Sequence, residues 1–148
     1  MRAIVESAMT MHCVFLTCFR APFFVLATTL HYSGVRLHQA ASLEEADFLL
    51  TVTDAKALLC DVTFPDGDWR DALRMVEQSH RFVPFLIAAD PVDAPFLSDA
   101  CTRGACGILW KPFDFTLAIH TVRAAGQAAR DRAALAAESS LAHAGPAQ

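Results

Sequence analysis

Two charged side chains stand at the ends of apolar segments and have the chemistry to act together. Asp61 follows the apolar run 57–60, and Lys111 follows the run 106–110. A carboxylate beside an ammonium group suits phosphoryl transfer, because the carboxylate can act as the nucleophile while the ammonium group holds the phosphoryl oxygens. The same two groups could instead form a partly buried ion pair that only holds two loops together. An X-Pro bond tolerates the cis form, so Pro112 could fix Lys111 in a tight turn.

The segments that carry these side chains must be close neighbours in one sheet. Short apolar runs predict strands at residues 12–18, 35–41, 56–62, 82–89 and 106–110. Helical spacing and capping signals predict helices at residues 21–34, 43–51, 69–79, 94–104 and 113–139. This alternation predicts an α/β fold with a five-stranded, doubly wound parallel sheet, helices on both faces and an extended C-terminal helix. In such a sheet, ligands bind at the carboxyl ends of the strands.

Several boundaries of these elements have specific signals. Ser42 and Glu45 have the spacing of a capping box at the start of the second helix. Gly34 and Gly104 are predicted to end the first and the fourth helix. The buried stripe of the last helix is predicted to consist of Phe115, Ile119 and Val122.

The composition indicates one globular domain. The chain has 148 residues, of which 54% are hydrophobic and 19% are charged, so it can form a sizeable core. We expect an N-terminal extension over 1–11, the domain over 12–126, and a helical extension with a frayed tail over 127–148. The net charge of −4 argues against a nucleic-acid surface, and no apolar run is long enough to span a membrane. Because no signal peptide is recognisable, we expect a cytoplasmic protein.

Cysteine, histidine and tryptophan residues give weaker signals. The five cysteines include no C-x-x-C pair, which argues against a disulfide framework or a zinc site, and most of them are expected to be buried. Cys60 is expected to face away from the site, as an inert thiol and not a redox sensor. His31 and His38 have no partner at metal-ligand spacing, and none of the six histidines is assigned to a metal. Trp69 and Trp110 are expected to pack in the interior, although an exposed Trp69 could anchor a partner protein.

Three motifs, in this order and spacing, resemble the receiver domain of bacterial two-component response regulators. They are LLCDVTFPDGDW (58–69), VPFLIAA (83–89) and RGACGILWKPFD (103–114), and the last contains the pattern G-A-x-G-x-x-x-K-P-F. The resemblance covers residues 12–126. It implies the same five-stranded, doubly wound sandwich that the alternation of elements predicts.

The resemblance also implies roles for individual residues. In the family, a histidine kinase transfers a phosphoryl group to the aspartate that ends the third strand, which corresponds to Asp61. A lysine before a cis proline contacts the phosphoryl group and corresponds to Lys111. The residue two positions after the aspartate, here Thr63, would offer its backbone carbonyl to Mg²⁺. The family further has an acidic metal-binding pair after the first strand, a switch hydroxyl after the fourth and a switch aromatic in the fifth.

This chain departs from the family pattern at its metal and switch positions. The acidic pair falls on Thr17 and Cys18, the hydroxyl falls on Ala89, and the aromatic falls on Ile108. Because Mg²⁺ prefers several oxygen ligands that include carboxylates, its affinity for this site is expected to be weakened, and phosphoryl transfer with it. Asp90 could serve as a substitute ligand, or it could cap a turn.

We therefore expect a stand-alone signalling module that is not an enzyme, since too little chain follows residue 126 for a DNA-binding output domain. It would act by binding a protein such as a histidine kinase or a downstream regulator, without conventional Mg²⁺-dependent phosphorylation. The contact, or a homodimer, would use an apolar patch on the fourth helix, the fifth strand and the fifth helix.

Two alternatives remain open at this point. The first is an ordinary single-domain regulator that accepts a phosphoryl group on Asp61, with Asp90 or water completing the metal shell. The second is a flavodoxin-like ligand-binding protein or reductase. It is disfavoured because the segment 17–24, TCFRAPFF, contains no glycine that could shape a phosphate-binding loop. No cofactor is assigned beyond the weakened Mg²⁺ site.

Overall fold

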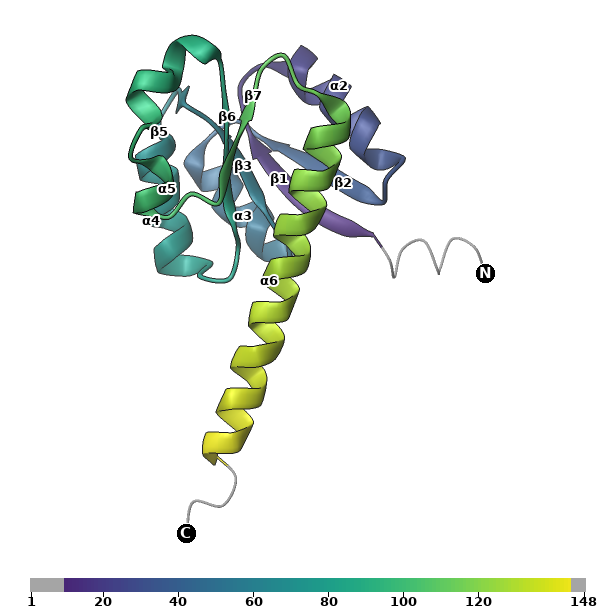
Figure 1. Cartoon of the computed structure of the whole chain (residues 1–148), viewed down its shortest axis with the longest axis vertical. Helices are drawn as coiled ribbons and strands as arrows, with labels where there is room; N and C mark the ends of the chain where they lie inside the picture. Colours follow the sequence, from purple (N-terminus) through teal and green to yellow (C-terminus); the bar gives the residue numbers. More distant parts are fainter. Residues whose placement is uncertain (1–9, 145–148) are drawn as a thin grey trace.

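A parallel sheet forms the centre of the molecule. The computed structural model describes residues 10–144, with side chains described as far as residue 139. Five strands lie in the order β2-β1-β3-β6-β7, and each neighbouring pair is parallel. The strands are β1 (Met11–Leu16), β2 (Val35–Ala40), β3 (Leu58–Asp61), β6 (Phe85–Ala89) and β7 (Gly107–Trp110). The predicted doubly wound α/β fold is confirmed (Figure 1).

Helices cover both faces of this sheet (Figure 1). The helices α2 (Arg20–His31) and α6 (Phe115–Ala144) pack on one face, while α3 (Leu43–Val52) and α4 (Trp69–Ser79) pack on the other. A 3₁₀-helix, η1 (Pro91–Leu97), and a short helix, α5 (Ala100–Arg103), connect β6 to β7. The C-terminal half of α6 projects beyond the body of the molecule (Figure 1).

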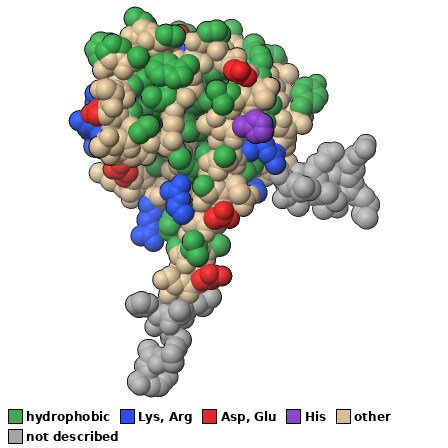
Figure 2. Space-filling view, viewed as in Figure 1, with side chains coloured by type: hydrophobic (Ala, Val, Ile, Leu, Met, Phe, Trp, Pro, Cys, Tyr) green, Lys and Arg blue, Asp and Glu red, His purple; other side chains and the backbone are tan. Residues whose placement is uncertain are grey.

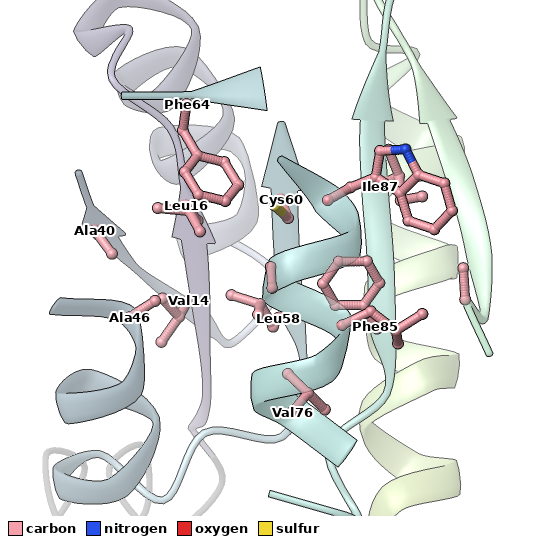
Figure 3. Close-up of a cluster of buried hydrophobic side chains, with 14 of the residues drawn as sticks. Val14, Leu16, Ala40, Ala46, Leu58, Cys60, Phe64, Val76, Phe85 and Ile87 are labelled. Atoms are coloured by element: carbon pink, nitrogen blue, oxygen red, sulfur yellow. The ribbon is translucent and has the colours of Figure 1, made fainter. Parts of the chain in front are cut away.

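Each face of the sheet has its own hydrophobic cluster, because successive side chains of a strand point to opposite faces. In β1, Val14 and Leu16 belong to the cluster under α3 and α4, whereas Cys13 and Phe15 belong to the cluster under α2 and α6. Figure 3 shows the first of these clusters, with side chains from β1, β3 and β6 meeting those of the helices. Strands buried on both faces explain why the chain has continuous apolar runs.

The segment between β3 and α4, where no further strand was predicted, forms a short hairpin. The strands β4 (Thr63–Phe64) and β5 (Gly67–Asp68) pair antiparallel. Asp68 then caps α4, since its side chain accepts hydrogen bonds from the N–H groups of Arg70 and Asp71. A side chain at Gly67 would place its Cβ only 2.6 Å from a carboxylate oxygen of Asp71, so it would have to displace the carboxylate that accepts the hydrogen bond of the Asp68 N–H.

The predicted helices 43–51 and 69–79 match α3 and α4, but the predicted helix 94–104 is wrong, because this segment forms the 3₁₀-helix η1 and the short α5. The Ser42 hydroxyl accepts a hydrogen bond from the N–H of Glu45 at 3.1 Å, while the Glu45 carboxylate accepts one from the N–H of Ala41. In this capping box, the Glu45 carboxylate therefore bonds to the residue before the N-cap residue Ser42 and not to Ser42 itself. Gly34 and Gly104 have φ angles of 78° and 132°, which favour glycine at these helix ends.

The predicted buried stripe of α6 is wrong in part. Phe115 is 41% exposed and Ile119 is only partly buried, whereas Ala118, Val122, Ala125 and Ala129 are buried. Small residues let the helix approach the sheet closely, so three alanines form its packed face together with Val122, the one predicted residue that is buried. The helix also continues to Ala144, beyond the predicted end at 139.

Two predictions about buried side chains also fail. Cys13 and Cys60 are buried, but Cys18, Cys101 and Cys106 are exposed. Trp69 is 1% exposed and packs as expected, which excludes it as an exposed anchor, whereas Trp110 is 41% exposed. The exposed cysteines and Trp110 lie near the end of a strand or helix. An apolar side chain at such a place can be exposed as well as buried.

Other predictions fall partly outside the described residues. The N-terminal extension over 1–11 is described only from Thr10 onward, and the tail predicted to fray extends beyond 144. Among the described helices, none is long and apolar enough to cross a membrane.

Candidate functional site

The carboxyl edge of the sheet brings the two expected charges together. The Lys111 Nζ donates a hydrogen bond to the Asp61 Oδ1 at 3.0 Å, although β6 lies between their strands. Their side chains are 19% and 5% exposed, respectively. The Lys111 N–H also donates to the carbonyl of Ala89 at 2.7 Å, and the Lys111–Pro112 peptide bond is cis. The turn after β7 therefore holds the lysine over the end of β6.

The two oxygens of the Asp61 carboxylate differ, because only Oδ1 has a hydrogen-bond partner among the described residues. The Asp61 Oδ2 is buried and has no hydrogen-bond partner among the described residues. A buried acceptor without a partner is uncommon, because it has lost its hydration without replacing it. This oxygen is the natural point of attachment for a phosphoryl group, a cation or a hydrogen-bond donor from another molecule.

The end of β1 uses its polar groups to shape the chain. Thr17 is fully buried, and its hydroxyl accepts a hydrogen bond from the N–H of Phe19 at 3.2 Å. The carbonyl of Thr17 accepts one from the side chain of Gln39 at 3.1 Å. Cys18 is exposed. Neither of these residues brings a carboxylate to the site.

Phe19 is a site residue that sequence reasoning missed. The Nζ of Lys111 lies 5.9 Å from the centroid of the Phe19 ring, within range of a cation–π contact. The lysine is thus held by a carboxylate and an aromatic ring together. The only signal in the sequence was an aromatic residue directly after the acidic-pair positions.

The end of β6 offers little to a ligand at Asp61. Ala89 is buried, and its methyl group cannot donate a hydrogen bond. Asp90 is exposed, and its N–H donates to the Asp93 carboxylate at 3.1 Å where η1 begins. Ile108 of β7 is partly buried and packs against the cluster under α3 and α4. The local geometry of Asp90 is that of a turn, which was one of its two expected roles.

The side chains of Cys60 and Trp69 are buried beneath the site and are unreactive. Burial raises the pKa of the Cys60 thiol well above its usual value, and the carboxylates of Asp61 and Asp68 raise it further. The thiol also donates to the carbonyl of Asp61 at 3.1 Å. Trp69 is 1% exposed, and its indole Nε1 has no hydrogen-bond partner among the described residues. Cys60 is therefore unsuited to redox sensing, as expected.

The donor set does not fit a conventional Mg²⁺ site. The predicted ligands were Asp61, the backbone of Thr63, and Asp90, of which only Asp61 has a buried carboxylate. Across residues 10–144, no group of three His, Cys, Asp or Glu side chains is arranged to hold a metal ion. Mg²⁺ requires near-octahedral oxygen coordination and usually one or two carboxylates besides its waters. The metal roles of Thr63 and Asp90 stay predictions.

Solved structures similar to this one include response regulators and receiver domains. The chain matches a protein described as a response regulator from Chloroflexus aurantiacus with a TM-score of 0.72 and 23% identity, covering 80% of this chain and 98% of that one. It matches the signal receiver domain of an HD domain-containing protein from Pseudomonas fluorescens with a TM-score of 0.75 and 17% identity, covering 84% and 92%. It matches the chemotaxis response regulator CheY4 of Vibrio cholerae with a TM-score of 0.68 and 19% identity, covering 78% and 98%.

No protein-family model matches the chain, and no curated protein matches it. The structural similarities therefore define the fold, which is that of response-regulator receiver domains. Function has to be argued from the site itself.

Proposed function

We propose that this chain is an atypical receiver domain of two-component signalling, which acts by binding another protein without conventional Mg²⁺-dependent phosphorylation. The observation that carries the proposal is the ion pair of Asp61 and Lys111, 3.0 Å apart, at a strand edge where Thr17 and Cys18 replace carboxylates. A carboxylate and a lysine suited to a phosphoacceptor site are present, but the two positions at which the family has an acidic pair hold Thr17 and Cys18.

The missing carboxylates matter because of charge. Phosphoryl transfer requires a metal or an equivalent cation to neutralise the negative charge on the phosphoryl oxygens. Lys111 supplies one positive charge, and the carboxylate of Asp61 already uses it. In addition, Ala89 cannot hydrogen-bond a phosphoryl group, so a phosphorylated Asp61 would lack the contact that couples modification to movement.

A candidate docking face lies beside the site, along η1, β7 and the start of α6. Five large hydrophobic side chains are exposed on these elements: Val92, Phe96, Trp110, Phe115 and Leu117. In Figure 2, which is viewed toward β7 and α6, hydrophobic side chains spread over the upper part of the body, and Lys and Arg side chains lie at its edges and near the point where α6 leaves it. Because β6 pairs with β7, the segments that follow them, η1 and α6, leave the same end of the sheet, and exposed apolar side chains there are candidates for an interaction surface.

The partner of this face is a protein, either a kinase or regulator of the same pathway or a second copy of the chain. Trp110 is the central anchor of the proposal, because tryptophan is enriched among residues that dominate binding energy. Its exposure of 41% leaves part of the indole available for a contact. The role is one of binding and not of catalysis.

One observation favours a second candidate, a phosphoacceptor that works despite its altered surroundings. The Oδ2 of Asp61 is unpartnered and Lys111 is in place beside Oδ1, so the nucleophile itself is intact. Water could complete a metal shell if the ion is held by Asp61 and the carbonyl of Thr63.

Mass spectrometry of the intact protein separates the two candidates. The protein is incubated with a small-molecule phosphodonor, with and without Mg²⁺, beside the Asp61→Asn variant. We expect no gain of a phosphoryl group in either condition. A Mg²⁺-dependent gain that Asp61→Asn abolishes would establish the second candidate and overturn the first.

A designed variant provides the matched positive control. Cys18→Asp restores one carboxylate at an exposed position, where a charge costs little to place. We expect it to gain one phosphoryl group at Asp61 in the presence of Mg²⁺, where the parent chain gains none. If it gains nothing, the missing carboxylate at 18 is not what limits the site.

A further inference from the structure

Two histidines far apart in the sequence meet on adjacent strands. His12 in β1 and His38 in β2 place Nδ1 and Nε2, respectively, 3.0 Å apart, and their rings are stacked with an interplanar angle of 22°. Both residues are half-buried. Neither belongs to the carboxyl-edge site, because the register pairs His12 with Arg36 and His38 with Val14, in the part of these strands away from Thr17.

We propose that His12 and His38 form a binding site for a divalent transition-metal ion of the Cu²⁺ or Ni²⁺ class. Imidazole nitrogen is a preferred ligand of these ions. Two such nitrogens from paired strands can chelate one ion, with water filling the other positions. Water is required because no third His, Cys, Asp or Glu completes a group anywhere in residues 10–144.

The spacing of the two nitrogens selects among metals. With metal–nitrogen bonds of about 2.1 Å, nitrogens 3.0 Å apart subtend about 90° at the metal. This is the angle between neighbouring ligands in tetragonal or octahedral coordination, which suits Cu²⁺ and Ni²⁺. Tetrahedral Zn²⁺ needs an angle near 109° and a separation of about 3.4 Å, so Zn²⁺ should bind more weakly.

The protonation state of the pair favours binding at neutral pH. A neutral imidazole has one nitrogen that carries a proton and one that keeps a lone pair, so each ring can offer one nitrogen to a metal ion. In the metal-free pair, one of the two contacting nitrogens carries the proton of their hydrogen bond. Metal binding requires that ring to move its proton to its other nitrogen, with no net release of protons.

The charged residues near His12 and His38 determine how strongly the pair binds a cation. Arg36 is in register with His12, and Lys56 lies next to it because the N–H of Lys56 donates to the His12 carbonyl at 2.7 Å. Lys56 is paired with Asp54 at 3.0 Å, which offsets part of its charge. The remaining positive charge of Arg36 opposes a cation, so we expect a micromolar and not a nanomolar site.

Thermal unfolding with added metal tests the site directly. The untagged full-length chain carries serine at its three exposed cysteines, Cys18, Cys101 and Cys106, so that thiols do not compete for metal. NiCl₂ or CuCl₂ should raise the Tm in a saturable manner, and ZnCl₂ should raise it less, because a ligand that binds only the folded state stabilises it. Excess chelator should reverse the shift.

Matched variants assign the effect to the pair. His12→Gln and His38→Gln should each weaken Ni²⁺ binding at least tenfold, as measured by titration calorimetry, while His120→Gln, at an exposed position on α6, should leave it unchanged. Electron paramagnetic resonance of the parent chain with one equivalent of Cu²⁺ should show two coupled nitrogens, and this readout does not depend on any variant folding. A Tm that metal does not raise, a shift kept by both Gln variants, or a spectrum without nitrogen coupling would each overturn the proposal.

Discussion

Two pairs of titratable side chains tie strands of this sheet together, and they differ in charge and in burial. Asp61 and Lys111 join opposite charges at the carboxyl edge, with side chains that are 5% and 19% exposed. His12 and His38 join two like groups nearer the other end of the strands, where both are half-buried. The distances, 3.0 Å in each case, are the same. The contacts therefore look alike, but their energetics should respond in opposite ways to the loss of one partner.

The two pairs differ in the side chain that remains when one partner is removed. Removing Lys111 would leave the carboxylate of Asp61 buried and uncompensated, which is costly in a medium of low dielectric constant. Removing one histidine leaves a neutral imidazole that can bond to water, and it removes a repulsion between two groups that would both be cations at acidic pH. Distance alone does not distinguish a stabilising pair from a pH-sensitive one.

The largest expected effect is the loss of the buried ion pair. Lys111→Met should reduce the free energy of unfolding by about 3 kcal/mol, since one partner of a buried pair is removed. Urea denaturation followed by tryptophan fluorescence measures it. The double variant Asp61→Asn, Lys111→Met is the control, and it should recover a large part of the loss. If the double variant is as unstable as the single one, packing of the lysine and not its charge is responsible.

An intermediate effect is expected from the histidine pair on acidification. Because the folded pKa of His38 lies below its unfolded value, the unfolded chain binds protons first, and stability falls as the pH drops from about 6.5 through the folded pKa. His38→Gln should flatten this part of the profile, measured by urea unfolding at a series of pH values. His120→Gln should leave the profile unchanged. A profile with the same slope in His38→Gln would place the pH dependence elsewhere.

The smallest effect is expected from the exposed ion pair of Lys56 and Asp54, which lies at the same end of the sheet as His12. Lys56 and Asp54 are also 3.0 Å apart, but the Asp54 side chain is 90% exposed. Lys56→Met should change the free energy of unfolding by no more than about 0.5 kcal/mol, because exposed ion pairs are screened by water. Measured beside Lys111→Met, it shows how much of the first effect comes from burial. Equal losses in the two variants would contradict that explanation.

The sequence was sufficient for the carboxyl-edge pair because local patterns and one general rule place it. Asp61 and Lys111 each end an apolar run, and parallel strands bring their carboxyl ends to one edge of the sheet. The same reasoning located α4 correctly at Trp69–Ser79, since its apolar residues recur with helical spacing. The functional roles of Asp61, Lys111, Thr63 and Asp90 stay predictions that the phosphodonor experiment tests.

The sequence was insufficient wherever a contact depends on register or on how closely two elements approach. His12 and His38 are 26 residues apart, and only the register of β1 against β2 brings their rings together. Phe115 has the correct spacing for a buried stripe on α6, but the close approach of the helix to the sheet buries Ala118 instead. Exposure of Cys18 and Trp110 likewise depends on where a strand stops and the chain turns.

By itself, then, the sequence determined the alternation of the five central strands with helices, the fold class and the meeting of Asp61 with Lys111, because periodicity and strand ends are local properties with known geometric consequences. The tertiary structure alone decided that the Asp61 Oδ2 has no partner among the described residues, that Phe19 faces Lys111, and that two histidines form a pair. These features arise from side chains of separate elements converging in space, and no local pattern along the chain encodes the distance between them.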